Sequence, residues 1–379
     1  MDEARAVLAR LDRIEELERE GAPPGVLLEE LRGLVQAAEA WAKLEGDERA
    51  RTAVERCDAS LAQPVAYSRG VGITHWDDVE KFRRERGQMS ATWTPLGGAA
   101  GSWKAGATRI ELEPGEQPTP PHIHGDAEEI FYVLSGSGLT LLDDDAYEIR
   151  AGDCIVYKSS HEVHTIRAGD NGLDVIAFGA REYLPTGELP RGGTMWSITG
   201  FIELQEGHPW DREPHLFWPD PLPGRPQTIV NTQDVEPDIR GGRRRRDLAR
   251  AAGSRWTGLK HIELDPGVLS GPPHVHSAEE EILVVLDGDG TLELTPSMPP
   301  AAEPEQHAVR RGSVVARPPG TGIAHAFRAG DTGLTLIAWG TREPNDICWY
   351  PRSKKIFWRG VGVIGRIEQL DYWEGEELE

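Results

Sequence analysis

Two kinds of hydrophobic pattern follow one another along the chain. From Glu3 to about Leu61 the apolar residues recur at i, i+3 and i+4, which is the period of an amphipathic helix. The segment GAPPG at residues 21–25 interrupts this pattern, because glycine and proline end helices. The sequence therefore predicts a helical hairpin over residues 1–64. We expect its apolar stripe to pack on a later domain, or on a second copy of the chain to form a homodimer.

After the hairpin the pattern changes to short runs of β-branched or aromatic residues separated by Gly, Pro and Asp. Such runs are typical of antiparallel β-barrels and sandwiches. They come in two sets that repeat each other. AAGSWKAGATRIELEPG from Ala99 matches AAGSRWTGLKHIELDPG from Ala251, and HTIRAGDNGLDVIAFGARE from His164 matches HAFRAGDTGLTLIAWGTRE from His325. The second copy is longer, and the Pro-rich loop TPSMPPAAEPE from Thr295 accounts for the difference.

The repeat suggests how the chain is divided. Its 379 residues are enough for two domains with full cores and a smaller appendage. We predict a first barrel over residues 65–205 and a second over residues 246–379. Between them, residues 206–245 mix Pro, Trp, His and charged residues without a period, which indicates a linker or wrapping segment.

Composition excludes several classes of protein. With 63 acidic and 41 basic residues the net charge is −22, which argues against binding to nucleic acid or to an anionic membrane surface. The three cysteines, Cys57, Cys154 and Cys348, form no C-x-x-C pair, so the sequence indicates neither a disulfide framework nor a thiolate zinc site. A reducing cytoplasm fits this cysteine usage best. No apolar run approaches the length needed to span a bilayer.

The candidate chemistry lies in a motif that occurs twice. PPHIHGDAEEIFYVLSGSG from Pro120 recurs as PPHVHSAEEEILVVLDGDG from Pro272. His122 and His124 are two residues apart, so on an extended strand both imidazoles point to the same face. Glu129 opens the next predicted strand, on the face that also carries apolar residues. A carboxylate among interior apolar residues is costly unless a positive charge neutralises it, and a divalent metal would do so.

A third imidazole from a later strand completes each set. We therefore predict one divalent metal per copy, because chance recurrence of eight matched residues is implausible. The ligands predicted in the first copy are His122, His124, Glu129 and His164, and those in the second are His274, His276, Glu281 and His325. Three imidazoles and one carboxylate suit Fe, Mn, Ni, Co or Zn, and the sequence does not choose among these ions.

These motifs resemble those of the cupin superfamily, and of the two-domain bicupins in particular. The first cupin motif is matched by HIHGDAEEIFYVLSG and HVHSAEEEILVVLDG, and GSVVARPPGTGIAH at Gly312 to His325 is similar to the other cupin motif. The resemblance covers about residues 85–205 and 245–370. It implies a mainly β fold in which two tandem jelly-roll β-barrels follow the helical hairpin, with one metal in each barrel. We expect the barrels to pack about a pseudo-twofold axis, like a fused dimer.

The first copy departs from this pattern in one loop. GDCIVYKSSHEVH replaces the Pro-Pro-Gly turn of the second copy. One interpretation places this polar loop over the metal, where His161 or Glu162 would donate and accept protons. The other is an ordinary solvated turn. If only one site is catalytic, we expect it to be the first.

The resemblance leaves three hypotheses for function. Bicupins include dioxygenases of aromatic or enol substrates, and decarboxylases or oxidases of small dicarboxylates. The first hypothesis is a metal-dependent oxidoreductase, a dioxygenase that acts on a small oxygenated organic substrate. The second is a non-redox decarboxylase or isomerase with the metal as Lewis acid. The third is a non-catalytic, metal-stabilised barrel that binds a small ligand.

Overall fold

The chain forms two compact units, Met1–Arg69 and Gly70–Glu379. The computed structural model describes residues 72–125, 127–158, 162–180, 187–197, 200–202, 208–297, 303–368 and 370, together with residues 7, 9–11, 13–14, 30–31, 33–34, 37–38 and 41. In the first unit the described residues are helical, and the Arg10 guanidinium donates to Glu30 Oε1 at 2.8 Å, which links the two predicted helices. Within the described part of the chain, none of the helices has both the length and the apolar character needed to cross a membrane.

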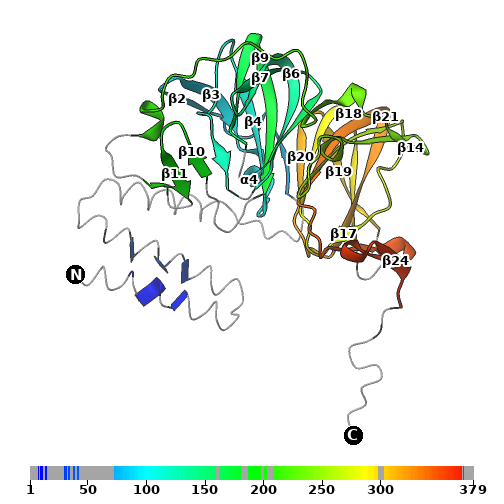
Figure 1. Ribbon diagram of the computed structural model, residues 1–379. Helices are drawn as coiled ribbons and strands as arrows, with labels where there is room; N and C mark the ends of the chain where they lie inside the picture. The colour runs from blue at the N-terminus through cyan, green and yellow to red at the C-terminus, as the bar shows by residue number, and fades with distance from the viewer. Residues whose placement is uncertain are drawn as a thin grey trace. The chain divides into compact units, whose positions relative to one another are not determined.

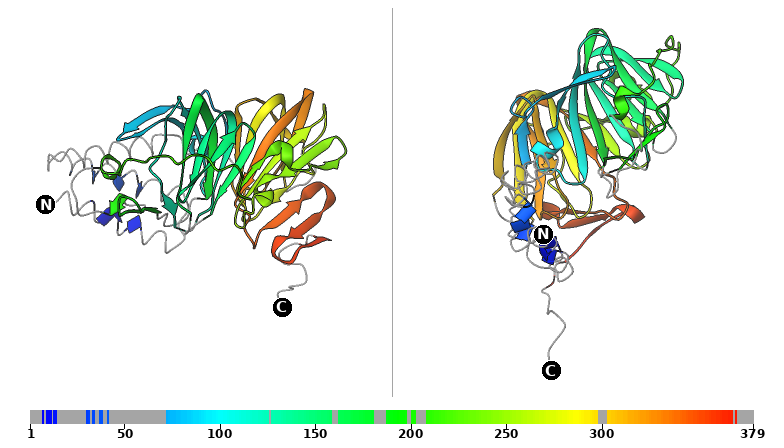
Figure 2. Two further views of the ribbon diagram at one scale, coloured as in Figure 1. Left: turned by 45° about the horizontal axis from the view of Figure 1, so that its top comes forward. Right: turned by 90° about the vertical axis from the view of Figure 1, so that its left-hand side faces the viewer.

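The second unit consists of two antiparallel β-barrels, which lie side by side in Figure 1 and in the left view of Figure 2. The mainly β fold predicted from the sequence is confirmed. The elements up to the middle of this unit are β1 (Gly72–His75), β2 (Phe82–Arg86), β3 (Met89–Thr94), α4 (Leu96–Ala99), β4 (Ala105–Leu112), β5 (Ile123–His124), β6 (Glu129–Leu142), β7 (Asp145–Arg150), β8 (Asp153–Tyr157), β9 (His164–Ala180), β10 (Gly187–Leu189), β11 (Thr194–Ser197), β12 (Gly200–Ile202) and η1 (Pro209–Asp211).

The remaining elements repeat this series, beginning with a strand that corresponds to β1. They are β13 (Ile229–Asn231), η2 (Thr232–Asp234), β14 (Asp238–Arg240), β15 (Arg243–Asp247), α5 (Leu248–Ala251), β16 (Gly258–Leu264), β17 (Val275–His276), β18 (Glu281–Pro296), β19 (Glu305–Arg310), β20 (Ser313–Arg317), β21 (Ile323–Gly340), β22 (Ile347–Tyr350), η3 (Pro351–Ser353), β23 (Lys355–Trp358), η4 (Arg359–Val361) and β24 (Val363–Arg366).

Each barrel is built from one eight-stranded and one four-stranded sheet. In the first barrel the orders are β13-β8-β6-β9-β4-β3-β2, with β7 added beside β6, and β12-β11-β10-β5. In the second they are β1-β20-β18-β21-β16-β15-β14, with β19 beside β18, and β17-β22-β23-β24. The two orders correspond element by element, so the structural repeat extends beyond the segments whose sequences match.

The barrels exchange one edge strand each. Strand β1 lies in the range predicted for the first barrel, yet it pairs with β20 of the second, with Gly72 opposite Ala316. Strand β13 lies in the predicted linker, yet it pairs with β8 of the first barrel, with Ile229 opposite Ile155. The segment 206–245 therefore contributes strands to both barrels. The domain boundaries at 64/65, 205/206 and 245/246 stay a prediction, and β15 runs across the last of them.

Both faces of the central strands are buried, which explains their continuous apolar sequences. In β6, Phe131 points into the first barrel, whereas Ile130 and Tyr132 point into a core that both barrels share. In that shared core the rings of Phe178 and Trp339 stack with their centroids 6.1 Å apart. The two barrels are thus joined by an apolar interface of the kind found inside a single domain.

One glycine in each copy of the motif has a backbone role. Gly136 and Gly288 adopt positive φ angles of 82° and 76°, and a Cβ atom at either position would collide with the carbonyl oxygen of Gly172 or Gly333. The pairing of β6 with β9, and of β18 with β21, shifts register next to these glycines. Both glycines therefore shape the strand that begins with the candidate metal-binding carboxylate.

Candidate metal centre

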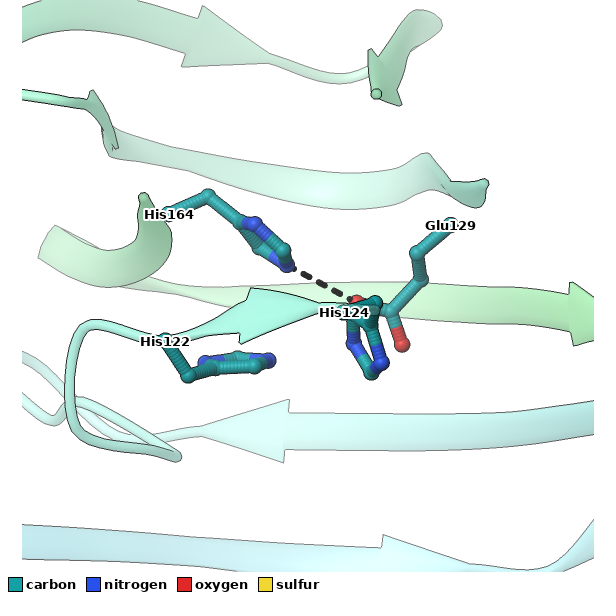
Figure 3. Close-up of side chains that lie close together, drawn as sticks. All are labelled: His122, His124, Glu129 and His164. Carbon is teal, nitrogen blue, oxygen red and sulfur yellow. Dashed lines mark hydrogen bonds and ion pairs between the residues drawn. The ribbon is translucent and has the colours of Figure 1, made fainter. Parts of the chain in front are cut away.

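The first barrel brings its four predicted ligands together. The backbones of His122 and His164 bond to each other, with N–H to O=C distances of 3.1 and 2.9 Å. His124 ends β5, and Glu129 begins β6. Nε2 of His124 and of His164 lie 3.3 and 3.2 Å from Glu129 Oε2. Figure 3 shows the four side chains converging, and one ligand atom from each lies within 4.8 Å of the others.

Backbone carbonyls fix which imidazole nitrogen faces the centre. His122 Nδ1–H donates to the Pro120 carbonyl at 2.9 Å, and His164 Nδ1–H donates to the Glu162 carbonyl at 3.1 Å. Because a carbonyl only accepts, Nδ1 carries the hydrogen and Nε2 of a neutral ring carries a lone pair. Nε2 of His164 faces Glu129 Oε2 at 3.2 Å, within hydrogen-bond distance. Three imidazole nitrogens and one carboxylate oxygen that converge in this way form a donor set that fits a divalent metal.

Electrostatics favour the metal-binding protonation states. Burial alone would raise the pKa of Glu129, but the imidazoles of His124 and His164 reverse this effect and hold it well below the usual range. Burial lowers the pKa of His122 well below its usual value, and the neighbouring imidazoles lower it further. At neutral pH the carboxylate is therefore ionised and His122 is neutral.

The second barrel repeats the backbone arrangement with a wider spacing of side chains. His274 and His325 bond through their backbones at 3.3 and 2.9 Å, as their counterparts do. Nε2 of His274, His276 and His325 lie 4.0, 3.4 and 3.1 Å from Glu281 Oε2. The ligand atoms of His274, Glu281 and His325 form one compact group, and His276 belongs to others.

A carboxylate that sequence reasoning did not single out holds His276. Asp346 is 1% exposed, and its Oδ2 accepts a hydrogen bond from His276 Nδ1 at 2.7 Å. Its Oδ1 accepts from the N–H groups of Ala278 and Glu279 at 3.0 and 3.2 Å. Burial would lower the pKa of His276, but the Glu281 and Asp346 carboxylates raise it to about 9. The signal in the sequence is an aspartate next to β22, the strand that pairs with the strand of His276.

A buried thiol also lies beside this second group. Cys348 lies opposite His276 in the β17–β22 pair. Its sulfur and the imidazole nitrogens of His274 and His276 lie within 4.8 Å of one another. Burial raises the pKa of Cys348 to about 12, so it is a thiol at neutral pH.

An aromatic side chain lines the first centre. Tyr157 sits opposite Glu129 in the β6–β8 pair, and its ring stacks on His164 with centroids 4.1 Å apart and planes 10° apart. Phe131 meets the Tyr157 ring edge to face at 5.2 Å. The Tyr157 hydroxyl bonds to Thr140 Oγ1 at 2.9 Å, so this end of the centre is apolar with its one hydroxyl satisfied.

Two basic side chains lie near the second centre instead. Arg317 takes the place of the tyrosine, opposite Glu281 in the β18–β20 pair. Lys260 shares a face of β16 with Ile262 and Leu264, which line the interior of the second barrel. Burial lowers the pKa of Lys260, and it lowers that of Arg317 to about 10, whereas the Glu281 carboxylate opposes both shifts. The second barrel therefore has two basic side chains that interact electrostatically with its carboxylate.

His161 and Glu162 are the two residues predicted to transfer protons. His161 lies outside the residues that the structure describes. Glu162 is described, and its carboxylate accepts from the Lys158 N–H at 3.0 Å, while its backbone carbonyl holds His164. Glu162 thus helps to orient a ligand through its backbone. Its predicted part in proton transfer stays a prediction.

Comparisons with known proteins agree with this architecture. A family model described as a cupin domain matches residues 108–178. The oxalate decarboxylase of Lactobacillus farciminis, in a complex with formate, has a similar fold, with a TM-score of 0.50 and 14% identity over 71% of this chain and 85% of that chain.

Two curated proteins match shorter stretches. They are an uncharacterised protein of Methanocaldococcus jannaschii, 40% identical over 47 residues, and the HTH-type transcriptional activator RhaR of Pectobacterium atrosepticum, 33% identical over 92 residues. The matches cover 12% and 22% of this chain. They span 38% and 32% of the length of those two relatives.

Proposed function

We propose that this chain, which is a two-domain protein of the cupin superfamily, is a metal-dependent enzyme whose reactive centre lies in the first barrel. The observation that carries the proposal is the convergence of three imidazoles and one carboxylate, because one ligand atom from each lies within 4.8 Å of the others. Such a donor set suits a divalent cation. The proposed ligands are His122, His124, Glu129 and His164.

The surroundings of the first centre favour an aromatic or enolic substrate. Tyr157 and Phe131 are buried aromatic neighbours of the ligands, and an apolar environment of this kind suits a flat, weakly polar molecule. A bound Fe(II) or Mn(II) would supply Lewis acidity and, with dioxygen, oxidising power. Backbone carbonyls hold the rings of His122 and His164 with Nε2 toward the centre. The proposed role of Glu162 and His161 is to move protons at the polar loop. The reaction class proposed is that of a dioxygenase.

The second barrel favours a different candidate function. The buried Arg317 and the half-buried Lys260, both within electrostatic reach of Glu281, would attract an anion, so this centre suits a small carboxylate. A carboxylate held there could lose CO₂ or be isomerised without a redox step. The decarboxylase or isomerase alternative therefore belongs to the second barrel.

Metal content tests the proposal first. Protein purified without a metal-affinity column is measured by inductively coupled plasma mass spectrometry, as wild type and as the variants His122→Ala and His274→Ala. We expect about two equivalents of first-row metal in the wild type and about one in each variant. His215→Ala serves as the control, because that histidine is exposed and lies outside both clusters. A wild type that binds no divalent metal even on reconstitution would refute the proposal.

Oxygen uptake then separates the reaction classes. Metal-loaded protein is screened with catechols, enols and small carboxylates in an oxygen electrode, with CO₂ release followed in parallel. Substrate-dependent oxygen consumption that is lost in His122→Ala supports the dioxygenase. CO₂ release without oxygen consumption, lost in His274→Ala, supports the decarboxylase. Tight binding with no turnover would favour the ligand-binding alternative.

A further inference from the structure

Each strand that carries a metal-ligand carboxylate begins next to a second glutamate that the proposed chemistry does not use. Glu128 precedes Glu129, and Glu280 precedes Glu281. Side chains alternate along an extended chain, so the ligand points into its own barrel and its neighbour points out of it. Glu128 is 3% exposed and Glu280 is 0% exposed. A carboxylate this deeply buried needs hydrogen-bond donors.

The donors for Glu128 all come from the second barrel. Its Oε1 accepts from the Arg255 N–H at 2.9 Å. Its Oε2 lies 2.7 Å from the Ser254 hydroxyl, 3.0 Å from the Trp256 N–H, and 3.2 and 3.1 Å from the N–H and hydroxyl of Thr257. The loop 254–257, which runs directly into β16, thus wraps one carboxylate of the first barrel.

The first barrel makes the matching contact with Glu280 of the second barrel. Glu280 accepts from the N–H groups of Trp103 and Lys104, at 3.1 and 2.5 Å. Burial raises the pKa of Glu280, and hydrogen bonds from Lys104, Ser102, Trp103 and Ala105 counter this rise. These donors occupy the loop 102–105, which runs directly into β4. Each loop begins at the serine that ends an AAGS segment, residues 99–102 or 251–254, so one repeated motif explains both contacts.

We infer that Glu128 and Glu280 are positioning residues that couple each candidate metal centre to the opposite barrel. One peptide bond joins each clamped glutamate to a metal-ligand glutamate, so a shift of the loop in one barrel displaces the ligand in the other. The shared apolar core limits how far the barrels can move apart. Because the two contacts are reciprocal, disturbance of either barrel reaches the centre of the other.

The coupling is tested in the full-length, metal-free protein by hydrogen–deuterium exchange. Ser254→Ala lies in the second barrel and removes one donor from Glu128. We expect exchange at the start of β6, residues 129–134, to become about fivefold faster, because one hydrogen bond to a buried charge is lost. The start of β18, residues 281–286, should not change. Ser102→Ala should give the opposite result, with faster exchange in β18 and unchanged exchange in β6.

A second measurement reads the metal centres one at a time, and it rests on the proposed function. His274→Ala leaves the first centre alone, and His122→Ala leaves the second. In the first background, Glu128→Gln should weaken Mn(II) binding about tenfold and change the Co(II) ligand-field spectrum, whereas Glu280→Gln should alter affinity less than about twofold. In the second background the two effects should exchange. Glu148→Gln, at an exposed site on β7, is the control.

The outcomes separate the two ideas. Substitutions that speed exchange only in their own barrel, or in both barrels equally, would overturn the coupling, and so would equal losses of Mn(II) affinity at both centres. A wild type that binds no Mn(II) would refute the proposed metal centres. The exchange experiment would still decide the coupling, because it needs no metal.

Discussion

The two barrels share a ligand framework but differ in the side chains around it. Paired backbones of the first and third histidines, one carboxylate at the start of a long strand, and a positive-φ glycine recur in both. The residue opposite the carboxylate is Tyr157 in the first barrel and Arg317 in the second. At matching positions of β4 and β16, Thr108 corresponds to Lys260. The framework is therefore kept, while the charge around it has changed.

The difference teaches that the residues that place the candidate ligands are separate from those that set the charge around them. Backbone pairing and strand alternation place the imidazoles, and these depend on the repeated strands. The neighbours that differ between the barrels lie on other strands, β8 and β4 in one barrel and β20 and β16 in the other. A duplicated chain can therefore retain two metal centres while giving each its own chemistry.

The largest expected effect comes from neutralising one carboxylate at a time. Glu129→Gln should lower turnover about 1000-fold, because the buried anion that balances the metal is removed from the proposed reactive centre. Glu281→Gln should leave turnover of the same substrate within about twofold. Steady-state kinetics on both variants, with metal content measured in each, would test the comparison. Equal losses in both variants would show that the centres do not act separately.

The second-largest expected difference between the two centres is in the pH dependence of metal binding. Metal binding needs a neutral imidazole, and the pKa of His276 is about 9, so at lower pH a proton must leave before the second centre binds. Its apparent affinity should rise about 50-fold from pH 7 to pH 9, because the neutral fraction of His276 rises by that factor. In the first centre His122 is already neutral and Glu129 already ionised at pH 7, so the rise should be much smaller.

Calorimetric titration of Mn(II) at several pH values would check this difference. The single-centre variants His274→Ala and His122→Ala report the first and second centres separately. Parallel slopes against pH in the two variants would contradict the prediction.

Removing the aspartate behind His276 should affect only one centre. Asp346→Asn keeps the shape but replaces a charged acceptor for His276 Nδ1, so we expect about tenfold weaker metal binding in the second barrel. Binding in the first barrel should not change. Asp331→Asn, at an exposed position of the same barrel, is the matched control. A loss of affinity in the first barrel would mean that Asp346 supports the whole fold.

The smallest expected effect concerns the aromatic residue of the first centre. Tyr157→Phe keeps the ring that stacks on His164 but removes the hydroxyl that bonds to Thr140. The free energy of unfolding should fall by about 1 kcal/mol, with metal affinity in both centres unchanged. Urea unfolding followed by circular dichroism, together with Mn(II) titration, measures both quantities. A large loss of affinity would give the hydroxyl a role at the metal.

Much of the fold could be predicted because it depends on local pattern. The period-2 runs and turn residues indicated strands, and the internal repeat indicated two barrels, since each copy carries the full alternation of one sheet. The exchange of β1 and β13 could not be predicted, because a strand's own sequence does not specify which of two similar sheets it joins. The segment 206–245 was interpreted as a linker for the same reason.

The sequence alone was enough to predict which four side chains come together in the first barrel and three of those that do so in the second. His-x-His spacing, a carboxylate at a strand start and a later histidine are properties of strand geometry, and this geometry is the same wherever the strand lies. Tertiary structure decided the rest. Pairings between distant strands bring Asp346, Arg317 and Lys260 to the second centre. Contact between the barrels brings Glu128 to the loop 254–257. Such contacts depend on how the whole chain packs, so no local sequence pattern predicts them.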